Sequence, residues 1–249
     1  MPTWIDNHCH IPPGSDGDEW VAAARAAGVA QMVTVGVTTE RSREAIAVAA
    51  RHEGVFATVG VHPHDATEGT AGIVDLLDAP DVVAIGEAGL DYHYDHSPRE
   101  VQKVVFAEHI RMANEHDLPL VIHTREAWPD TFEILDREGT PRRTVFHCFT
   151  GGPDEAAAGV ERGIMISISG IVTFKNARDL QDAVRATPLE SLMVETDSPY
   201  LAPVPHRGKP NRPANVVHVG EAVAALKDLP VEDVAAATSA AAIGFYGLT

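Results

Sequence analysis

The sequence predicts an α/β fold, a (β/α)8 TIM barrel built as a single domain over residues 1–249. Short runs rich in Val and Ile recur at intervals of roughly 20–37 residues, which is the spacing of successive βα units. Ala-, Glu- and Arg-rich stretches with apolar residues at helical spacing separate most of these runs. Alternating strands and helices favour a parallel sheet, and about eight strands in a chain of this length favour a closed barrel.

The candidate strands are short and apolar, as strands buried on both faces must be. In chain order they are Thr3-Trp4-Ile5, QMVTVGV from Gln31, FATVGV from Phe56, VVAIGEAGL around Val83, LPLVIHTR from Leu118, RTVFHCFT from Arg143, GIMISISG from Gly163 and SLMVETDSPY from Ser191. A doubly wound open sheet is the main alternative. It would usually carry a Gly-rich phosphate loop after its first strand, whereas the first strand here ends in HCH.

The candidate helices carry apolar residues at helical spacing, and several end in Gly. They are DEWVAAARAAG, ERSREAIAVAARHEG, VQKVVFAEHIRMANEHD, EAWPDTFEILDREG and DLQDAVRA, followed near the C-terminus by AVAALKDLP and VEDVAAATSAAAIGFYG. The histidines that fall in helical stretches are expected to be exposed. These are His52, His109, His116 and His218.

The composition is that of a globular protein with a sizeable core, because 45% of the residues are hydrophobic. Two cysteines are too few for a disulfide framework, and we expect Cys9 and Cys148 to be buried fillers. No apolar run approaches the roughly 20 residues of a membrane span, and no signal peptide is visible. We therefore expect a cytoplasmic protein with no membrane contact and no obligate protein partner.

The net charge of −17 argues against broad electrostatic capture of nucleic acid. It leaves open a nucleic-acid substrate that is held at a small site. An acidic pocket filled with cations is compatible with phosphate chemistry.

Polar side chains stand where the predicted strands end. They are His8 and His10, His62 and His64, Glu87, His123, His147 and Asp197. The carboxyl ends of barrel strands form the face on which barrel enzymes keep their chemistry. Because side chains alternate along a strand, His8 and His10 point to the same side and Cys9 points to the other.

Four histidines and two carboxylates from these strand ends predict a metal centre. Neutral imidazoles and carboxylates are the usual ligands of Zn²⁺, Mn²⁺ and Mg²⁺. This set exceeds what one tetrahedral ion needs, whereas two ions about 3.5–4 Å apart that share a carboxylate would use all six groups. We therefore predict two divalent metal ions (Zn, Mn or Mg) as the cofactor.

Six motifs spread over nearly the whole chain carry a resemblance to a known family. They are IDNHCH, GVHPHD, AIGEAGLDYH, VIHTREA, VFHCFTG and ETDSPYLAPVPHRGKPNRPANV. In this order they resemble the TatD family of metal-dependent deoxyribonucleases, a branch of the amidohydrolase-like barrels. The resemblance implies that His8, His10, Glu87 and Asp197 bind one metal. It implies that Glu87, His123 and His147 bind the other, so that Glu87 bridges the two ions, and that His62 and His64 lie near the pocket without being ligands.

The activity implied is hydrolysis of phosphodiester bonds, as in a DNA exonuclease, by a water activated between two metal ions. We expect Glu87, Asp197 and His62 to be the catalytic residues. Asp197 would accept a proton from the water, or act as a ligand only. His62 or His64 would protonate the leaving alkoxide or hold a phosphate.

The expected substrate is DNA, either single-stranded or at strand ends. The predicted substrate contacts are His64, Arg125 and Arg207. Arg207 lies in HRGKPNR, a basic segment of an acidic chain. Tyr92 and Tyr200 could stack on a base or could only line the pocket, the second being favoured for Tyr200.

Two other functions remain open from the sequence. The first is a hydrolase of small amides or lactones, although such barrels often bridge their metals with a carboxylated lysine on the fourth strand, where this chain has Glu87. The second is a metal-binding scaffold without catalysis, which the retention of every ligand disfavours.

Overall fold

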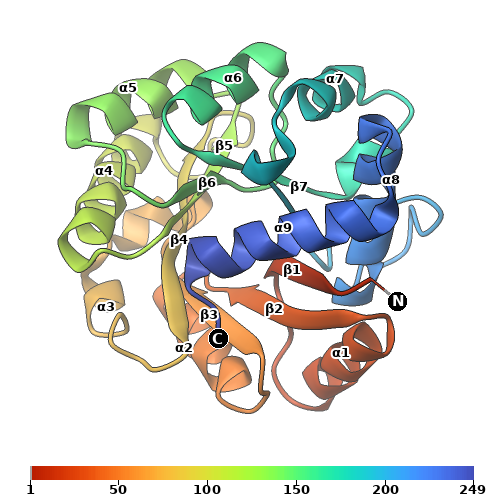
Figure 1. Cartoon of the computed structure of the whole chain (residues 1–249). Coiled ribbons are helices and arrows are strands. Elements are labelled where there is room, and N and C mark those ends of the chain that lie inside the picture. The colour runs from red at the N-terminus through yellow and green to blue at the C-terminus, as the bar shows by residue number, and fades with distance from the viewer. Residues whose placement is uncertain (1) are drawn as a thin grey trace.

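The computed structural model describes residues 2–249 of the chain. Eight parallel strands form one sheet in chain order, surrounded by helices (Figure 1). The strands are β1 (Trp4–Cys9), β2 (Val29–Val35), β3 (Val55–Val59), β4 (Val82–Asp91), β5 (Leu120–Arg125), β6 (Thr144–Phe146), β7 (Met165–Ile168) and β8 (Leu192–Val194). The last strand joins the first where Asn7 Nδ2 donates to the Val194 carbonyl at 2.7 Å and the Asp197 amide donates to the His8 carbonyl at 2.9 Å. The prediction of a (β/α)8 barrel is confirmed.

The helices that connect the strands pack outside the barrel. They are α1 (Ser15–Ala26), α2 (Thr39–Ala49), α3 (Ala71–Val74), α4 (Arg99–His116), α5 (Trp128–Glu138), α6 (Pro153–Glu161), α7 (Arg178–Ala186) and α8 (Val216–Lys227). The last helix, α9 (Val231–Tyr246), crosses the end of the barrel at which the strands begin (Figure 1). There Ser239 Oγ donates to the Thr3 carbonyl at 3.1 Å, and Phe245 packs near Ile5. Because α9 covers this end, the opposite end remains for the polar residues.

The structure differs from the sequence prediction in a few elements. The prediction omits α3, which is a single turn, and α6, which follows Gly-Gly-Pro and so resembles a loop. In the structure Pro153 occupies the first turn of α6, where its missing N–H costs nothing, and the Glu155 carboxylate accepts from the Gly152 amide at 2.8 Å. His8 lies inside β1, β4 continues beyond Glu87 to Asp91, and β5 continues beyond His123 to Arg125, so these three side chains lie within strands.

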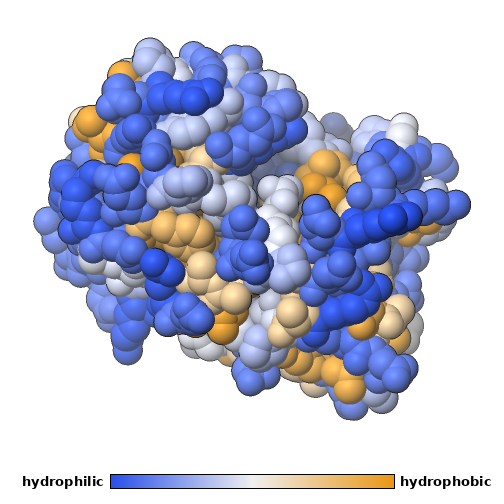
Figure 2. All heavy atoms as spheres, turned by 90° about the horizontal axis from the view of Figure 1, so that it is seen from above, coloured by the Kyte–Doolittle hydropathy of each residue, from blue (hydrophilic) through white to orange (hydrophobic). Residues whose placement is uncertain are grey.

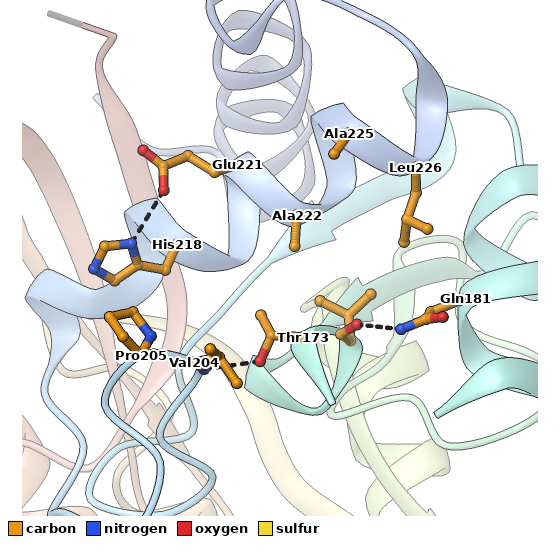
Figure 3. A pocket seen from close by; sticks show the side chains of 10 residues that line it. Thr173, Gln181, Val204, Pro205, His218, Glu221, Ala222, Ala225 and Leu226 are labelled. Carbon is orange, nitrogen blue, oxygen red and sulfur yellow. Dashed lines mark hydrogen bonds and ion pairs between the residues drawn. The ribbon is translucent and has the colours of Figure 1, made fainter. Parts of the chain in front are cut away.

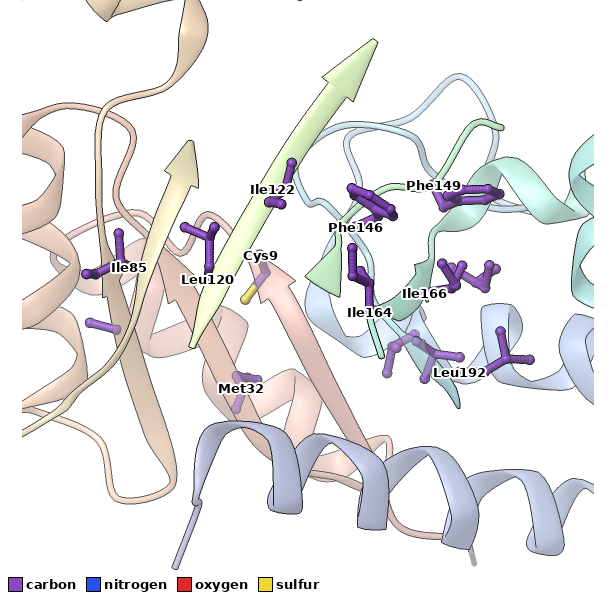
Figure 4. Packing of buried hydrophobic residues seen from close by; sticks show 14 of the residues in the cluster. Cys9, Met32, Ile85, Leu120, Ile122, Phe146, Phe149, Ile164, Ile166 and Leu192 are labelled. Atoms are coloured by element: carbon purple, nitrogen blue, oxygen red, sulfur yellow. The ribbon is translucent and has the colours of Figure 1, made fainter. Parts of the chain in front are cut away.

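The main hydrophobic core fills the layer between the strands and the outer helices. Figure 4 shows Ile122 of β5 and Phe146 of β6 among the side chains of this layer. Each such side chain contributes roughly 1.5–3 kcal/mol when it is fully buried. Trp4 packs so closely on Gly220 of α8 that a Cβ at Gly220 would lie 2.1 Å from the indole ring. Helix α8 therefore approaches β1 only because position 220 lacks a side chain.

One face of the molecule is mostly polar. Figure 2 shows a face on which hydrophilic side chains predominate and hydrophobic patches are small. Within residues 2–249, none of the helices combines the length and the apolar character that crossing a bilayer would require.

Two glycines shape β4 around Glu87. The β4–β5 register shifts between Ile85 and Ala88, and a bulge of this kind redirects a side chain. Gly86 has φ +134°, and a Cβ there would lie 2.5 Å from the Val121 carbonyl oxygen. Gly89 has φ +145°, and a Cβ there would lie 1.9 Å from the His123 carbonyl oxygen. Only glycine therefore allows β4 to bring Glu87 this close to β5.

We expect Gly89→Ala to lower the free energy of unfolding by at least about 2 kcal/mol, because the methyl group meets backbone and φ is positive. The matched control is Gly244→Ala on α9, where a Cβ would have nothing within 4 Å. There the helix propensity of Ala should raise stability by up to about 1 kcal/mol. Urea unfolding of both variants measures the difference, and equal stabilities would contradict the close approach of β4 and β5.

Candidate metal centre

The carboxylate of Glu87 lies among imidazoles from four other strands or their ends. Its Oε1 is 2.9 Å from His123 Nδ1, 2.9 Å from His147 Nε2 and 3.3 Å from His62 Nε2. Its Oε2 is 3.5 Å from His8 Nε2. The two oxygens of one carboxylate therefore face different sets of nitrogen atoms.

Asp197 extends this cluster on the side of β1. Its Oδ1 is 3.4 Å from His10 Nε2 and 3.9 Å from His8 Nε2. Both histidines thus face the same carboxylate, as strand alternation predicts, while Cys9 Sγ points to the Val33 carbonyl at 3.3 Å. Cys9 is a buried filler as expected, but Cys148 is only partly buried and lies 3.3 Å from Ser169 Oγ.

The cluster fits a metal site by the test of distance. Zinc–ligand bonds of roughly 2.0–2.2 Å place neighbouring ligand atoms roughly 3–3.5 Å apart, the separation found around Glu87 and Asp197. Groups able to hold an ion are His8 with Glu87 and His147, His8 with His10 and Asp197, and His62 with Glu87 and His123.

His8 supplies a second, independent indication. Its ring is 0% exposed, and within the described residues neither of its nitrogens has a hydrogen-bond partner. A buried polar atom without a partner costs roughly 1–3 kcal/mol. A cation bound at one nitrogen would remove part of that cost, so the residues present fit a metal ion.

The carboxylates of the cluster are ionised at neutral pH. Burial alone would raise the pKa of Glu87, but the imidazoles of His147, His62 and His123 hold that pKa well below its usual value. Burial opposes ionisation of Asp197 too, and the hydrogen bond from His10 outweighs it, so the pKa of Asp197 is lowered. The site therefore offers two anionic oxygen ligands together with its imidazoles.

Groups behind the cluster select the tautomers of the histidines. His147 Nδ1 lies 3.0 Å from the fully buried carboxylate of Glu195, and His10 Nδ1 lies 3.3 Å from the Val35 carbonyl. Each Nδ1–H donates to its oxygen, so Nε2 is the nitrogen that faces Glu87 or Asp197 and that could bind a cation. The sequence prediction missed Glu195, although it stands two residues before Asp197 in VETD.

His62 presents the opposite tautomer. Its Nδ1 accepts a hydrogen bond from the His64 amide at 3.1 Å, so in the neutral ring the proton is on Nε2, beside Glu87. Burial lowers the pKa of His62 to about 4, and the ring is neutral at pH 7. Nε2 therefore donates a hydrogen bond in this tautomer, so of the three groups named above the one that includes His62 suits a cation least.

Asp91 is a further buried carboxylate that the sequence prediction missed. Its Oδ2 lies 3.0 Å from His64 Nε2 and 3.2 Å from His123 Nε2. Gln102 holds the backbone of Asp91 from both sides, accepting from its amide at 2.8 Å and donating to its carbonyl at 3.1 Å. Strand alternation from Glu87 would have placed Asp91 on the same face of β4.

The expectation that His109 is exposed is wrong. This ring is 0% exposed, its Nε2 accepts from the Val61 amide at 3.1 Å and its Nδ1–H donates to the Val105 carbonyl at 2.7 Å. It therefore links α4 to the segment that begins GVHPHD. Of the other three, His116 is exposed, whereas His52 and His218 are partly buried.

The two arginines among the predicted substrate contacts stack on aromatic rings. Arg125 stacks on Tyr94 at 4.8 Å, and Arg207 stacks on Phe174 at 4.3 Å. Tyr92 is committed to a hydrogen bond with Asp130 at 2.6 Å. The other candidate, Tyr200, is 62% exposed, and its ring centroid is 6.1 Å from that of His10. Tyr200, not Tyr92, is thus the tyrosine free to meet a ligand.

The fold and this cluster together define the class of metal-dependent barrel hydrolases. A family model described as TatD related DNase matches residues 5–247, and the chain belongs to this family. It is 38% identical over 243 residues to the uncharacterized metal-dependent hydrolase YabD of Bacillus subtilis, covering 94% of this chain and 95% of that protein. It is 36% identical to the 3'-5' ssDNA/RNA exonuclease TatD of Citrobacter rodentium, over 94% of this chain and 93% of that protein. The crystal structure of YJJV, a TatD homologue of Escherichia coli, matches with a TM-score of 0.92 and 29% identity over 99% of this chain and 98% of that chain.

His109 should make stability depend on pH. Burial lowers the pKa of His109 to about 4, below the roughly 6.5 of an unfolded histidine. The unfolded chain therefore binds more protons between these values, and the free energy of unfolding falls as the pH falls from about 6.5 toward 4. His109→Gln keeps an acceptor for Val61 but does not titrate. Between about pH 7.5 and pH 5, we expect the free energy of unfolding to fall by on the order of 2 kcal/mol less in this variant than in the wild type.

Urea unfolding at several pH values measures this change. The matched control is His116→Gln, an exposed histidine on the same helix, which should leave the pH dependence unchanged. Equal pH dependence in wild type and His109→Gln would contradict a buried, neutral His109.

Proposed function

We propose that the protein is a divalent-metal-dependent phosphodiesterase that removes nucleotides from single-stranded DNA or from strand ends. The observation that carries this proposal is the Glu87 carboxylate, with Oε1 2.9 Å from both His123 and His147 and Oε2 3.5 Å from His8. One carboxylate turned toward two sets of nitrogens suits a cation pair, as in nucleases and phosphatases. The Citrobacter rodentium relative, named a 3'-5' ssDNA/RNA exonuclease, supports the same reaction class.

The proposed ligands come from the carboxyl ends of several strands. His8, His10, Glu87 and Asp197 would hold one ion, and Glu87, His123 and His147 would hold the other. Such a set of imidazoles and carboxylates fits Zn²⁺, Mn²⁺ or Mg²⁺. When bound, the ions supply a water of lowered pKa and positive charge for the phosphoryl oxygens.

Asp197 and His62 are the proposed groups that handle protons and hydrogen bonds. The Asp197 side chain is ionised and 14% exposed, so it can accept the proton of the attacking water. The Nε2–H of His62 is directed at Glu87 and donates to a phosphoryl or leaving oxygen that enters beside it. With a pKa of about 4, His62 does this as a neutral ring.

The remaining proposed contacts hold the rest of the substrate. The His64 side chain is 28% exposed and anchored by Asp91, which suits a contact to phosphate. Arg125 and Arg207 supply positive charge, and Tyr200 supplies an exposed ring on which a base can stack. Because the net charge is −17, these few local contacts suit a short strand end better than a long duplex.

An activity assay on the purified protein tests this function. The metal is stripped and Mg²⁺, Mn²⁺, Co²⁺ or Zn²⁺ is restored. We then expect metal-dependent release of mononucleotides from a labelled single-stranded oligonucleotide. A panel of amides and lactones is offered in parallel. Turnover of that panel with intact oligonucleotide would replace the phosphodiesterase with the amidohydrolase-type alternative.

A substitution at Glu87 tests the shared ligand. Glu87→Ala should lower the rate by at least about a hundredfold, because both ions lose a ligand. Its matched control is Glu100→Ala on α4, whose side chain is 85% exposed and which should leave the rate unchanged. Metal content per chain is measured on the same samples. Near-full activity in Glu87→Ala would refute the bridging role.

A further inference from the structure

A second pair of histidines lies outside the Glu87 cluster. His206 belongs to the loop that follows β8, and His218 lies in the first turn of α8. Their Nε2 atoms are 3.2 Å apart, and the ring centroids are 5.1 Å apart. His218 Nδ1 lies 3.0 Å from the carboxylate of Glu221, one turn further along α8 (Figure 3).

The carboxylate determines which nitrogen of His218 is free. Glu221 accepts the Nδ1–H of His218, so Nε2 carries the lone pair and faces Nε2 of His206. This is the arrangement of carboxylate, histidine and metal in which an outer carboxylate orients a ligating ring. The 3.2 Å separation also matches two neighbouring ligands on one tetrahedral ion, given metal–nitrogen bonds of roughly 2.0–2.1 Å.

The surroundings leave room for an ion and its water ligands. A cavity of about 430 Å³ is lined by His218 and Glu221 on one side and by Val204 and Pro205, the residues before His206, on the other (Figure 3). The His218 side chain is 32% exposed, so a hydrated cation can reach the ring. The Glu221 carboxylate adds negative charge at the same place.

We propose that His206 and His218 form a separate binding site for a transition-metal cation of the Zn²⁺, Ni²⁺ or Cu²⁺ type. Imidazole nitrogen suits these ions, whereas Mg²⁺ and Ca²⁺ require oxygen ligands. The bound ion links the loop after β8 to α8. It takes no ligand from the Glu87 cluster, so this site does not depend on the proposed phosphodiesterase activity.

Isothermal titration with Zn²⁺ near neutral pH tests the proposal. We expect His218→Gln and His206→Gln each to bind one Zn²⁺ ion per chain fewer than the wild type. Glutamine can restore a hydrogen bond between loop and helix but supplies no imidazole ligand. These variants therefore separate a metal site from a simple bond between the two rings. The matched control, His52→Gln, removes a partly buried histidine that pairs with Asp18 at 3.0 Å and should bind as many ions as the wild type.

Two further measurements keep this site distinct from the Glu87 cluster. Glu87→Ala should retain the ion held by His206 and His218. Its Cu²⁺ spectrum by electron paramagnetic resonance should then lose the nitrogen signal of one ion per chain when His218→Gln is added. Circular dichroism verifies that each variant is folded. Unchanged Zn²⁺ stoichiometry in folded His206→Gln and His218→Gln overturns the proposal. Loss of the same ion in Glu87→Ala also overturns it.

Discussion

The buried carboxylate of Glu87 is the constraint on which the rest of the structure depends. Its side chain is 5% exposed, and removal of a carboxylate from water costs several kcal/mol unless charge and hydrogen bonds offset the loss. The barrel offsets it by surrounding one side chain with imidazoles from β1, β5 and the loops after β3 and β6. The glycines on either side let β4 bulge far enough to meet them. Because the parallel strands end at one mouth of the barrel, enough imidazoles lie around Glu87 to offset the cost of burying its charge.

A second layer of buried polar groups orients the imidazole rings around Glu87. Glu195 takes one nitrogen of His147, Asp91 takes one of His123, and the His64 amide takes one of His62. Each bond leaves a single nitrogen facing the cluster, so the rings are oriented before any ligand arrives. His109 belongs to the same layer, because it bonds the backbone just before His62. The layer therefore fixes which nitrogen of each ring faces the cluster.

Sequence periodicity predicts the barrel and the strand residues of the site, but it does not predict contacts between residues that are far apart in the chain. The spacing of apolar runs was enough for the barrel, and strand alternation was enough to bring His8 and His10 to one carboxylate. It was not enough for Glu195 and His109, because their roles depend on partners 48 residues away in each case. From sequence alone, a histidine in a helical stretch such as His109 is expected on the surface, because the segment that packs over it is not known. The α6 helix was missed for a local reason, since Gly-Gly-Pro resembles a loop as much as a helix start.

The loop between β8 and α8 contributes residues to both candidate ion sites. Asp197 lies near its beginning, and Asn211, whose side chain is fully buried, lies toward its far end. The Asn211 amide nitrogen donates to the Pro199 carbonyl at 2.9 Å and its Nδ2 donates to the Thr196 carbonyl at 2.9 Å. Because these bonds tie the far part of the loop back to its beginning, Arg207 lies within a turn that they close. Asp197, His206 and Arg207 all belong to this loop. An ion bound at His206 would therefore act on the segment that positions Asp197 and that offers positive charge to an anionic substrate.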